Sequence, residues 1–205
     1  MVDRRLFAVV PAAGLSRRMG QPKLLLPLGD STVIDRLLKT LDVPQITDTV
    51  IVIRPDDATL ASQIQPHRAR IVQPTVAPPD MRDSVQLAID AIEKEYAPND
   101  DDGWMLIPAD HPILHAECLS EIIAAWNNSV ADILIPRYEG RRGHPTILSW
   151  KIAGETHTIP DDKGLNWLVR KYADSTEFFE SNHEAIVIDL DTPEDYERLR
   201  QSEST

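Results

Sequence analysis

The sequence predicts an α/β fold with three layers, in which helices cover both faces of a mostly parallel β-sheet. Short apolar runs of strand length alternate with amphipathic helical patterns along the chain, which is typical of strand–helix–strand units. The 205 residues, of which 42% are hydrophobic and 26% charged, are enough for a globular domain with a full core. With no internal repeat and no low-complexity tract in view, we expect residues 1–205 to form a single domain.

The first half of the chain supplies the clearest elements. A strand is expected at residues 6–10, an apolar run that ends abruptly in small residues. Thr32 and Asp35 fit a capping box at the start of a helix over residues 32–41. The elements expected after it are strands at 49–53 and 70–73, a helix at 57–64, an irregular loop around the prolines at 74, 78 and 79, and a helix at 82–96.

The second half begins with an acidic run, residues 99–103, which we expect to be a solvated turn. A strand at 104–107 follows. The only cysteine, Cys118, falls in an expected helix at 115–126, where core packing fits it better than a nucleophilic role. The remaining expected elements are strands at 133–135 and 146–148 around an arginine- and glycine-rich hairpin at 139–143, a final strand at 186–190, and a terminal helix opened by Pro193.

The charge of the chain is strongly acidic, with 33 acidic against 21 basic residues and a net charge of −12. Such a surface repels nucleic acid and anionic membranes, so we expect neither as a partner. No apolar run reaches the roughly 18 residues of a membrane span. Five of the cations stand in the first 23 residues, which suggests a local basic pocket: Arg4, Arg5, Arg17, Arg18 and Lys23.

The expected location is the cytoplasm. A single cysteine excludes an internal disulfide and fits a reducing compartment. Arg4 and Arg5 before an apolar stretch imitate a secretory signal, but cleavage after that stretch would destroy the loop described next.

The loop at residues 12–23, AAGLSRRMGQPK, carries the strongest functional signal. Its small residues allow a ligand close to the backbone, Ser16 offers a hydroxyl, and three cations follow within eight positions. A small-residue turn after a strand, with free N–H groups and clustered cations, suits a polyphosphate such as a nucleotide. The alternative to an anion-binding loop is a purely structural tight turn with cations on the surface. The spacing matches neither GxxxxGK[ST] nor GxGxxG.

Carboxylates follow two of the expected strands. Asp110 comes just after the strand at 104–107, and ligands of open α/β sheets lie at the carboxyl ends of strands, so we expect it on one rim with residues 12–23 and 74–84. Mg²⁺ prefers one or two carboxylates plus substrate phosphates, which fits Asp110, although a plain turn residue is the alternative. Asp189 and Asp191 would share one face of the last strand, where a cation between them would offset their repulsion. Asp191 or Thr192 could instead cap the terminal helix.

The loop closely resembles the signature AAGxSxRMGxxK of nucleotidyltransferases, and within these it looks like the molybdenum-cofactor group, whose enzymes join a nucleotide to molybdopterin. Other segments resemble the same family in the same order. They are Met81 and Ser84 in MRDS, Asp110 in PADHP, the Gly143-His144-Pro145 turn, residues 162–168, and DLDTPED at 189–195. Two positions depart from the family pattern: His111 stands where Gln or Met is expected, and Asn166 where Arg is usual.

The resemblance implies a Rossmann-like fold of the nucleotide-diphospho-sugar transferase type and an Mg²⁺-dependent reaction, with Mn²⁺ as a substitute. It implies that Lys23, Arg18 and Asp110 are catalytic. The nucleotide-binding set is then Ala12, Ala13, Gly14, Ser16, Arg18, Lys23, Met81 and Ser84; the metal ligands are Asp110 and Asp189; His144 and Asp191 face the acceptor.

The resemblance also implies the substrates. The guanylyl branch of the family has two glycines where this chain has Ala12 and Ala13, and the added methyls favour the smaller base of CTP. The expected acceptor is molybdopterin, with a molybdoenzyme as a possible partner. The alternatives are another nucleotide, GTP or UTP, with a sugar or polyol phosphate as acceptor, and a non-catalytic protein that binds the cofactor for a molybdoenzyme.

Overall fold

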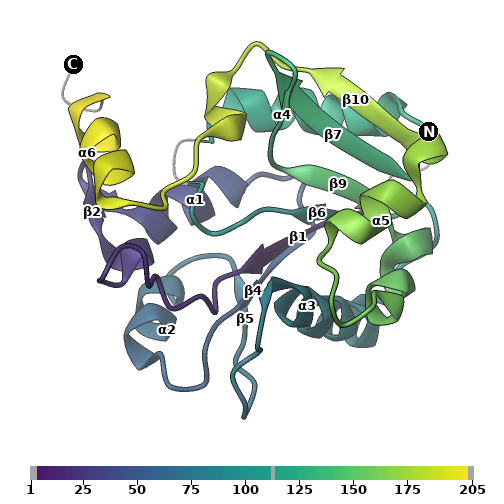
Figure 1. Ribbon diagram of the computed structural model, residues 1–205. Coiled ribbons are helices and arrows are strands. Elements are labelled where there is room, and N and C mark those ends of the chain that lie inside the picture. The colour runs from purple at the N-terminus through teal and green to yellow at the C-terminus, as the bar shows by residue number, and fades with distance from the viewer. Residues whose placement is uncertain (1–3, 112–113, 203–205) are drawn as a thin grey trace.

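The computed structural model describes residues 4–111 and 114–202. Its main sheet has the strand order β10-β7-β9-β6-β1-β4-β5 (Figure 1), and the short strand β8 also pairs with β7. The strands are β1 (Leu6–Pro11), β4 (Asp48–Val52), β5 (Arg70–Val72), β6 (Gly103–Leu106), β7 (Ile133–Tyr138), β8 (Arg141–Arg142), β9 (Thr146–Ser149) and β10 (Thr176–Glu180). Two short strands, β2 (Pro27–Leu28) and β3 (Ser31–Thr32), form a separate antiparallel pair.

The sheet is mostly parallel, as predicted. β1 pairs in parallel with β4 and β6, β4 with β5, and β10 with β7. β9 is antiparallel to both of its neighbours, β6 and β7. The helices are α1 (Val33–Leu41), α2 (Ala58–Ile64), α3 (Met81–Tyr96), α4 (Ala116–Asn128), α5 (Asn166–Lys171) and α6 (Pro193–Ser202), and the 3₁₀ helices are η1 (Lys23–Leu25), η2 (Trp150–Thr158), η3 (Ala173–Ser175) and η4 (Glu184–Val187).

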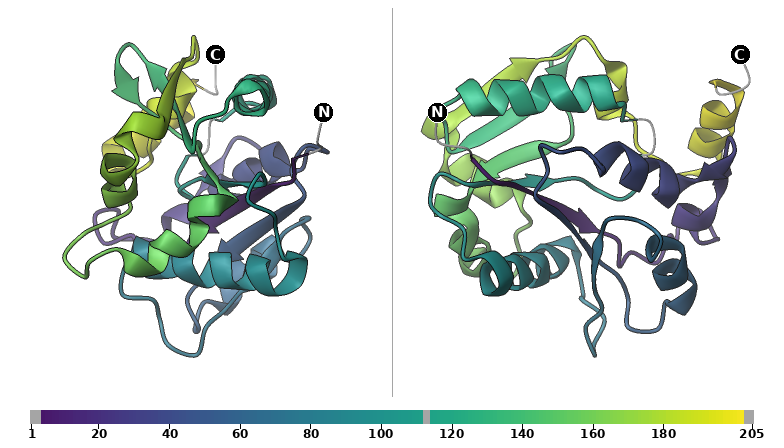
Figure 2. Two further views of the ribbon diagram at one scale, coloured as in Figure 1. Left: turned by 90° about the vertical axis from the view of Figure 1, so that its right-hand side faces the viewer. Right: turned by 180° about the vertical axis from the view of Figure 1, so that it is seen from behind.

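Two hydrophobic cores lie on the two faces of the sheet, because successive side chains of each strand point in opposite directions. In β1, Leu6, Ala8 and Val10 pack on the face covered by α1, α2 and α4. Phe7 and Val9 pack on the other face, against α3, η2 and α5. Figure 2 shows α4 and α3 on opposite sides of the sheet. The three-layer prediction is therefore confirmed.

Several local predictions are confirmed as well. Thr32 caps α1, with a complete capping box to Asp35, and Pro193 is the first residue of α6. Cys118 is fully buried in α4, and burial raises the pKa of its thiol to about 11, so it packs as a core residue. None of the helices in the described ranges has the length and apolarity to cross a bilayer.

The predicted strand at 186–190 is wrong. Its start lies in the 3₁₀ helix η4, and its apolar side chains Ile186, Val187 and Leu190 are buried without any strand pairing. The place beside β7 is taken by β10, an edge strand whose side chains are half-buried or exposed. The sequence pattern of β10 is weak because its burial is partial.

Asp102 also departs from the prediction of a solvated turn. It is only 4% exposed and accepts hydrogen bonds from the backbone and side chain of Arg5 and from the backbone N–H of Asn99. Arg4 lies at the same end of β1, where it donates to the carbonyls of Trp126 and Ser129. Arg4 and Arg5 therefore stabilise the fold at the end of β1 opposite the loop at 12–23, and do not belong to a basic pocket with the other three cations.

Candidate active site

The loop at residues 12–23 leaves the carboxyl end of β1 and turns back tightly on itself. Ala12 donates its N–H to the carbonyl of Val52 (2.8 Å), which fixes the start of the loop to β4. The carbonyl of Ser16 then accepts from the N–H groups of Met19 and Gly20 (3.0 and 3.1 Å). Gly20 adopts a positive φ of 67°, which glycine allows at little cost. The hydroxyl of Ser16 accepts from the N–H of Lys23 (3.3 Å) and closes the loop.

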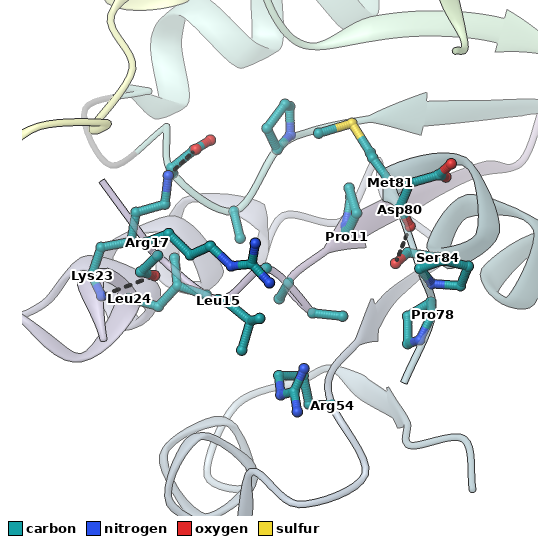
Figure 3. A pocket seen from close by; sticks show the side chains of 18 residues that line it. Pro11, Leu15, Arg17, Lys23, Leu24, Arg54, Pro78, Asp80, Met81 and Ser84 are labelled. Carbon is teal, nitrogen blue, oxygen red and sulfur yellow. Dashed lines mark hydrogen bonds and ion pairs between the residues drawn. The ribbon is translucent and has the colours of Figure 1, made fainter. Parts of the chain in front are cut away.

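A cleft of about 390 Å³ opens beside this loop (Figure 3). Three segments that the sequence predicted on one rim line it together: the loop itself, residues 78–84 around the start of α3, and residues 108–110 after β6. Of the predicted nucleotide-binding residues, seven line the cleft: Ala12, Ala13, Gly14, Ser16, Lys23, Met81 and Ser84. Arg18 is outside this lining and Arg17 is within it.

Lys23 joins the loop to two acidic segments far away in the chain. Its Nζ lies 2.5 Å from Oδ2 of Asp110 and 3.1 Å from Oδ1 of Asp191, and it also donates to the carbonyl of Leu190 (2.9 Å). The Lys23 side chain is only 16% exposed. Arg18, by contrast, is 71% exposed and pairs with Oδ2 of Asp191 at 3.0 Å. Of the predicted catalytic residues, Lys23 thus contacts Asp110 directly and shares Asp191 with Arg18.

Asp189 and Asp191 do not share a strand face, because neither lies in a strand. Asp191 contacts Lys23 and Arg18, whereas Oδ1 of Asp189 lies 2.9 Å from Nε2 of His111. The bond to His111 holds the pKa of the Asp189 carboxyl below its usual value. The two carboxylates therefore have separate partners.

The cap of α6 is Thr192, not Asp191. The hydroxyl of Thr192 accepts from the N–H of Asp195, and Oδ2 of Asp195 accepts from the N–H of Thr192 (2.8 Å). This reciprocal pair is a capping box. Asp191 is left with its contacts to the cations of the loop.

His111, which contacts Asp189, packs against His144. Their rings pack edge to face, with centroids 5.0 Å apart, and His111 is only 3% exposed, so it is a packed residue. Burial, aided by the neighbouring His111, lowers the pKa of His144 to about 4, so the ring is neutral at pH 7. Within the described residues, Nδ1 of each ring is buried without a hydrogen-bond partner.

A second cavity, of about 530 Å³, adjoins the cleft and shares Asp80 and Met81 with it. His144 and Thr146 lie in its wall, together with apolar side chains from β6, β9 and α5: Trp104, Leu106, Leu148, Leu168 and Val169. Asn166, one of the two departures from the family pattern, lines this cavity too. The site is therefore a cleft with a charged end and an adjoining, largely apolar cavity.

The residues that could hold a metal ion are Asp110 and Asp189. The described part of the chain has no group of three or more His, Cys, Asp or Glu side chains arranged around one metal position. Asp110 keeps Oδ1 outside its pair with Lys23, and the Asp189 side chain is 54% exposed. Two hard oxygen donors fit Mg²⁺ or Mn²⁺ that also binds the phosphates of a ligand, and do not fit an all-protein cage.

Sequence reasoning missed Arg54 as a lining residue. Arg54 lies two residues beyond the carboxyl end of β4, the parallel neighbour of β1. The rule that ligands gather at the carboxyl ends of parallel strands would have found it.

A family model described as the MobA-like NTP transferase domain matches residues 8–176. The purine catabolism protein PucB of Bacillus subtilis (strain 168) is 27% identical over 207 residues, covering 97% of this chain and 98% of PucB. The molybdenum cofactor cytidylyltransferase of Escherichia coli (strain K12) is 23% identical, with 92% of each chain covered. A 2-C-methyl-D-erythritol 4-phosphate cytidylyltransferase of Salmonella arizonae is 35% identical over 147 residues, which are 67% of this chain and 58% of that enzyme.

Solved structures share the whole fold. A homologue of Mycobacterium tuberculosis Rv0371c from Mycobacterium sp. strain JC1 is 25% identical, with a TM-score of 0.77 over 100% of this chain and 98% of that one. Rv0371c in complex with manganese has a TM-score of 0.76 and 24% identity, covering 96% and 98%. A 4-diphosphocytidyl-2C-methyl-D-erythritol synthase has a TM-score of 0.75 at 16% identity, covering 97% and 98%, which confirms the nucleotide-diphospho-sugar transferase type of fold.

Proposed function

The chain belongs to the MobA-like NTP transferase family and is a nucleotidyltransferase, and from this premise we propose that it transfers CMP from CTP to the phosphate of molybdopterin, with release of pyrophosphate. The observation that carries the proposal is the position of Lys23. Its ammonium group joins the small-residue loop of the nucleotide cleft to Asp110 and Asp191. The neutral His144 stands in the adjoining cavity.

In the proposed reaction an oxygen of the acceptor phosphate attacks the α-phosphorus of CTP, and the bond from that phosphorus to the bridging oxygen breaks. Rate then depends on placing the two phosphates in line and on neutralising the charge of the transition state. Lys23, which is largely buried, offers a fixed ammonium group for this charge, and Arg18 offers a more mobile guanidinium. The N–H groups of Ala13 and Gly14 bind phosphate oxygens from the other side.

Asp110 and Asp189 would hold a divalent ion, which would supply positive charge to the phosphate oxygens when bound. Two features support this assignment: the hard oxygen donors of the two carboxylates, and the manganese found with the related Rv0371c. Asp191 has a different task, because its contacts with Lys23 and Arg18 hold both cations at the charged end of the cleft.

Two features support CTP as the nucleotide. The methyl groups of Ala12 and Ala13 narrow the cleft beside the loop, which favours a pyrimidine over a purine. Among the relatives, the Escherichia coli and Salmonella enzymes are both cytidylyltransferases.

The adjoining cavity supports a heteroaromatic acceptor such as the pterin of molybdopterin. Its walls are mostly apolar, and a flat ring buries its faces against such walls while its edge meets a few polar groups. Two residues of this wall carry a buried polar atom without a partner among the described residues: the indole N–H of Trp104 and Nδ1 of His144.

A polyol phosphate acceptor is the second candidate, favoured by the 35% identity to the 2-C-methyl-D-erythritol 4-phosphate cytidylyltransferase. Incubating the purified protein with each NTP, Mg²⁺ and either acceptor, and measuring pyrophosphate, tests both. We expect release with CTP and molybdopterin, and its loss in Lys23→Ala. Release with the polyol phosphate alone would replace molybdopterin as the acceptor, and no release with any NTP would overturn the proposed reaction.

A further inference from the structure

Arg54 lies in the wall of the nucleotide cleft, and nothing in the proposed reaction uses it. It lies two residues beyond the end of β4, and its backbone is held in place from two sides. The side-chain amide of Gln73 donates to the carbonyls of both Arg54 and Pro55 (3.0 Å each). Pro55 also restricts the backbone of the residue before it. The guanidinium therefore projects from a fixed position.

The orientation of the guanidinium is set by Asp56. Nε and Nη2 of Arg54 donate to the two carboxylate oxygens of Asp56, at 3.1 and 3.2 Å. A guanidinium has five N–H groups in one plane. Within the described residues, the Arg54 side chain makes only these two hydrogen bonds, so both N–H groups of Nη1 and one of Nη2 are free to donate to a ligand. One N–H of Nη1 and the remaining N–H of Nη2 point in the same direction, so they form a second pair of parallel donors at the outer edge of the guanidinium.

Arg54 lies away from the charged end of the cleft. In Figure 3 its guanidinium is below Leu15 and Pro78, whereas the amino group of Lys23 lies at the upper left, beside Asp110. A nucleotide whose phosphates meet Lys23 and runs along residues 12–14 brings its base toward Leu15, Pro78 and Arg54. Leu15 and Pro78 offer apolar surfaces for the faces of a base, and Arg54 offers donors for its edge.

We propose that Arg54 selects the nucleobase by donating two parallel hydrogen bonds to a base edge that has two adjacent acceptors. This inference rests on the proposed nucleotide substrate and deepens it. Cytosine presents such a pair in O2 and N3, and guanine presents one in O6 and N7. Uracil has a protonated N3 between its two carbonyls, and in adenine every acceptor on the exposed edges stands beside the N6 amino group or alone. Arg54 therefore favours CTP and GTP over UTP and ATP.

Two other roles for Arg54 lead to different results. An arginine that bound a phosphate would strengthen the binding of all four nucleotides equally, because all four carry the same triphosphate. An arginine that only paired with Asp56 would have no effect on nucleotide binding, since surface ion pairs contribute little even to stability. Base selection alone makes the preference between nucleotides depend on the guanidinium.

The test measures the Kd of CTP, GTP, UTP and ATP in the presence of Mg²⁺ by titration calorimetry. The variants are Arg54→Lys, which keeps the charge and loses the fork, and Arg54→Gln, which loses both. Asp56→Asn keeps Arg54 and loosens its orientation. Arg68→Gln, at an arginine whose side chain is 56% exposed and which does not line the cleft, is the matched control, and the Tm of each variant reports its folding.

We expect the wild type and Arg68→Gln to bind CTP or GTP more tightly than UTP and ATP, by about 10- to 100-fold. In Arg54→Lys this preference should fall toward unity, while the affinity for UTP changes little. Asp56→Asn should lower the preference in part. A uniform loss for all four nucleotides, or a preference that survives Arg54→Gln, overturns the role of Arg54 and leaves the proposed reaction standing. A wild type that binds none of the four overturns the proposed reaction itself.

Discussion

The ammonium nitrogen of Lys23 lies 2.5 Å from Oδ2 of Asp110, although 87 residues separate the two in the chain. The contact crosses from the loop after β1 to the segment after β6, and these two strands are parallel neighbours in the sheet. Both side chains are less than a quarter exposed, so the pair is stronger than an exposed one. The charged end of the cleft is therefore built into the fold before any ligand binds.

Replacing Lys23 by Ala should lower turnover by about 10²–10³-fold, the usual cost of removing one preorganised contact to the charge of a transition state. It also leaves Asp110 and Asp191 without the cation between them. The measurement is pyrophosphate release at saturating CTP and Mg²⁺. Arg17→Ala, which removes a cation of the same loop that lines the cleft, is the control for a general loss of positive charge. Unchanged turnover in Lys23→Ala would refute the assigned role.

Much of the fold could be predicted because its strands are buried on both faces. Residues 6–10 and 104–107 are apolar without interruption, and both lie in the centre of the sheet. β10 could not be predicted in the same way, because an edge strand with half-exposed side chains leaves a weak pattern. The run at 186–190 is apolar because it covers the core, and burial alone does not distinguish a strand from an irregular segment.

The members of the site could be predicted better than their pairing. The loop motif and the strand-end rule together placed Lys23, Ser84 and Asp110 on one cleft. The partners of Asp189 and Asp191 depended instead on the path of the chain between η4 and α6, which carries no repeating pattern. Asp191 therefore contacts Lys23, and Asp189 contacts His111, where a strand would have placed both on one face.

Asp102→Ala should lower the free energy of unfolding by about 3 kcal/mol, because it leaves the Arg5 guanidinium and two backbone N–H groups without their acceptor. The value belongs at the low end of the range for buried pairs, since the Arg5 side chain is 34% exposed. Urea unfolding measures it, as a lower midpoint with an unchanged m value. Asp101→Ala, at an exposed position of the same turn, is the control, and equal midpoints for the two variants would contradict the prediction.

His144 should make stability depend on pH between about 6.5 and 4. Burial lowers its pKa to about 4 in the native state, whereas the unfolded chain takes up a proton near the ordinary value of 6.5. Over this interval the unfolded state binds more protons, so stability falls as the pH falls, by up to about 3 kcal/mol. Above pH 6.5 the contribution is constant.

Urea unfolding of the wild type and His144→Gln at pH 7.0 and pH 4.5 measures this contribution. The difference between the two pH values should be smaller in the variant. His157→Gln, which removes a histidine whose side chain is 45% exposed, is the control. A pH difference in His144→Gln as large as that of the wild type would show that another group causes the acid sensitivity.

Asn substitutions at the three carboxylates should separate metal binding from the positioning of the cations. Asp110→Asn and Asp189→Asn should lower turnover far more than CTP affinity, because Lys23 and the loop still bind the triphosphate, and added Mg²⁺ or Mn²⁺ should restore part of the activity. Asp191→Asn should lower turnover without rescue by metal, because Asp191 positions Lys23 and Arg18 and does not hold the ion. Thr192→Ala, in the capping box of α6, is the control and should lower only the stability, by about 1 kcal/mol. Titrating Mg²⁺ against pyrophosphate release for each variant decides between the carboxylates: rescue of Asp191→Asn, together with wild-type behaviour of Asp189→Asn, would make Asp191 the second metal ligand.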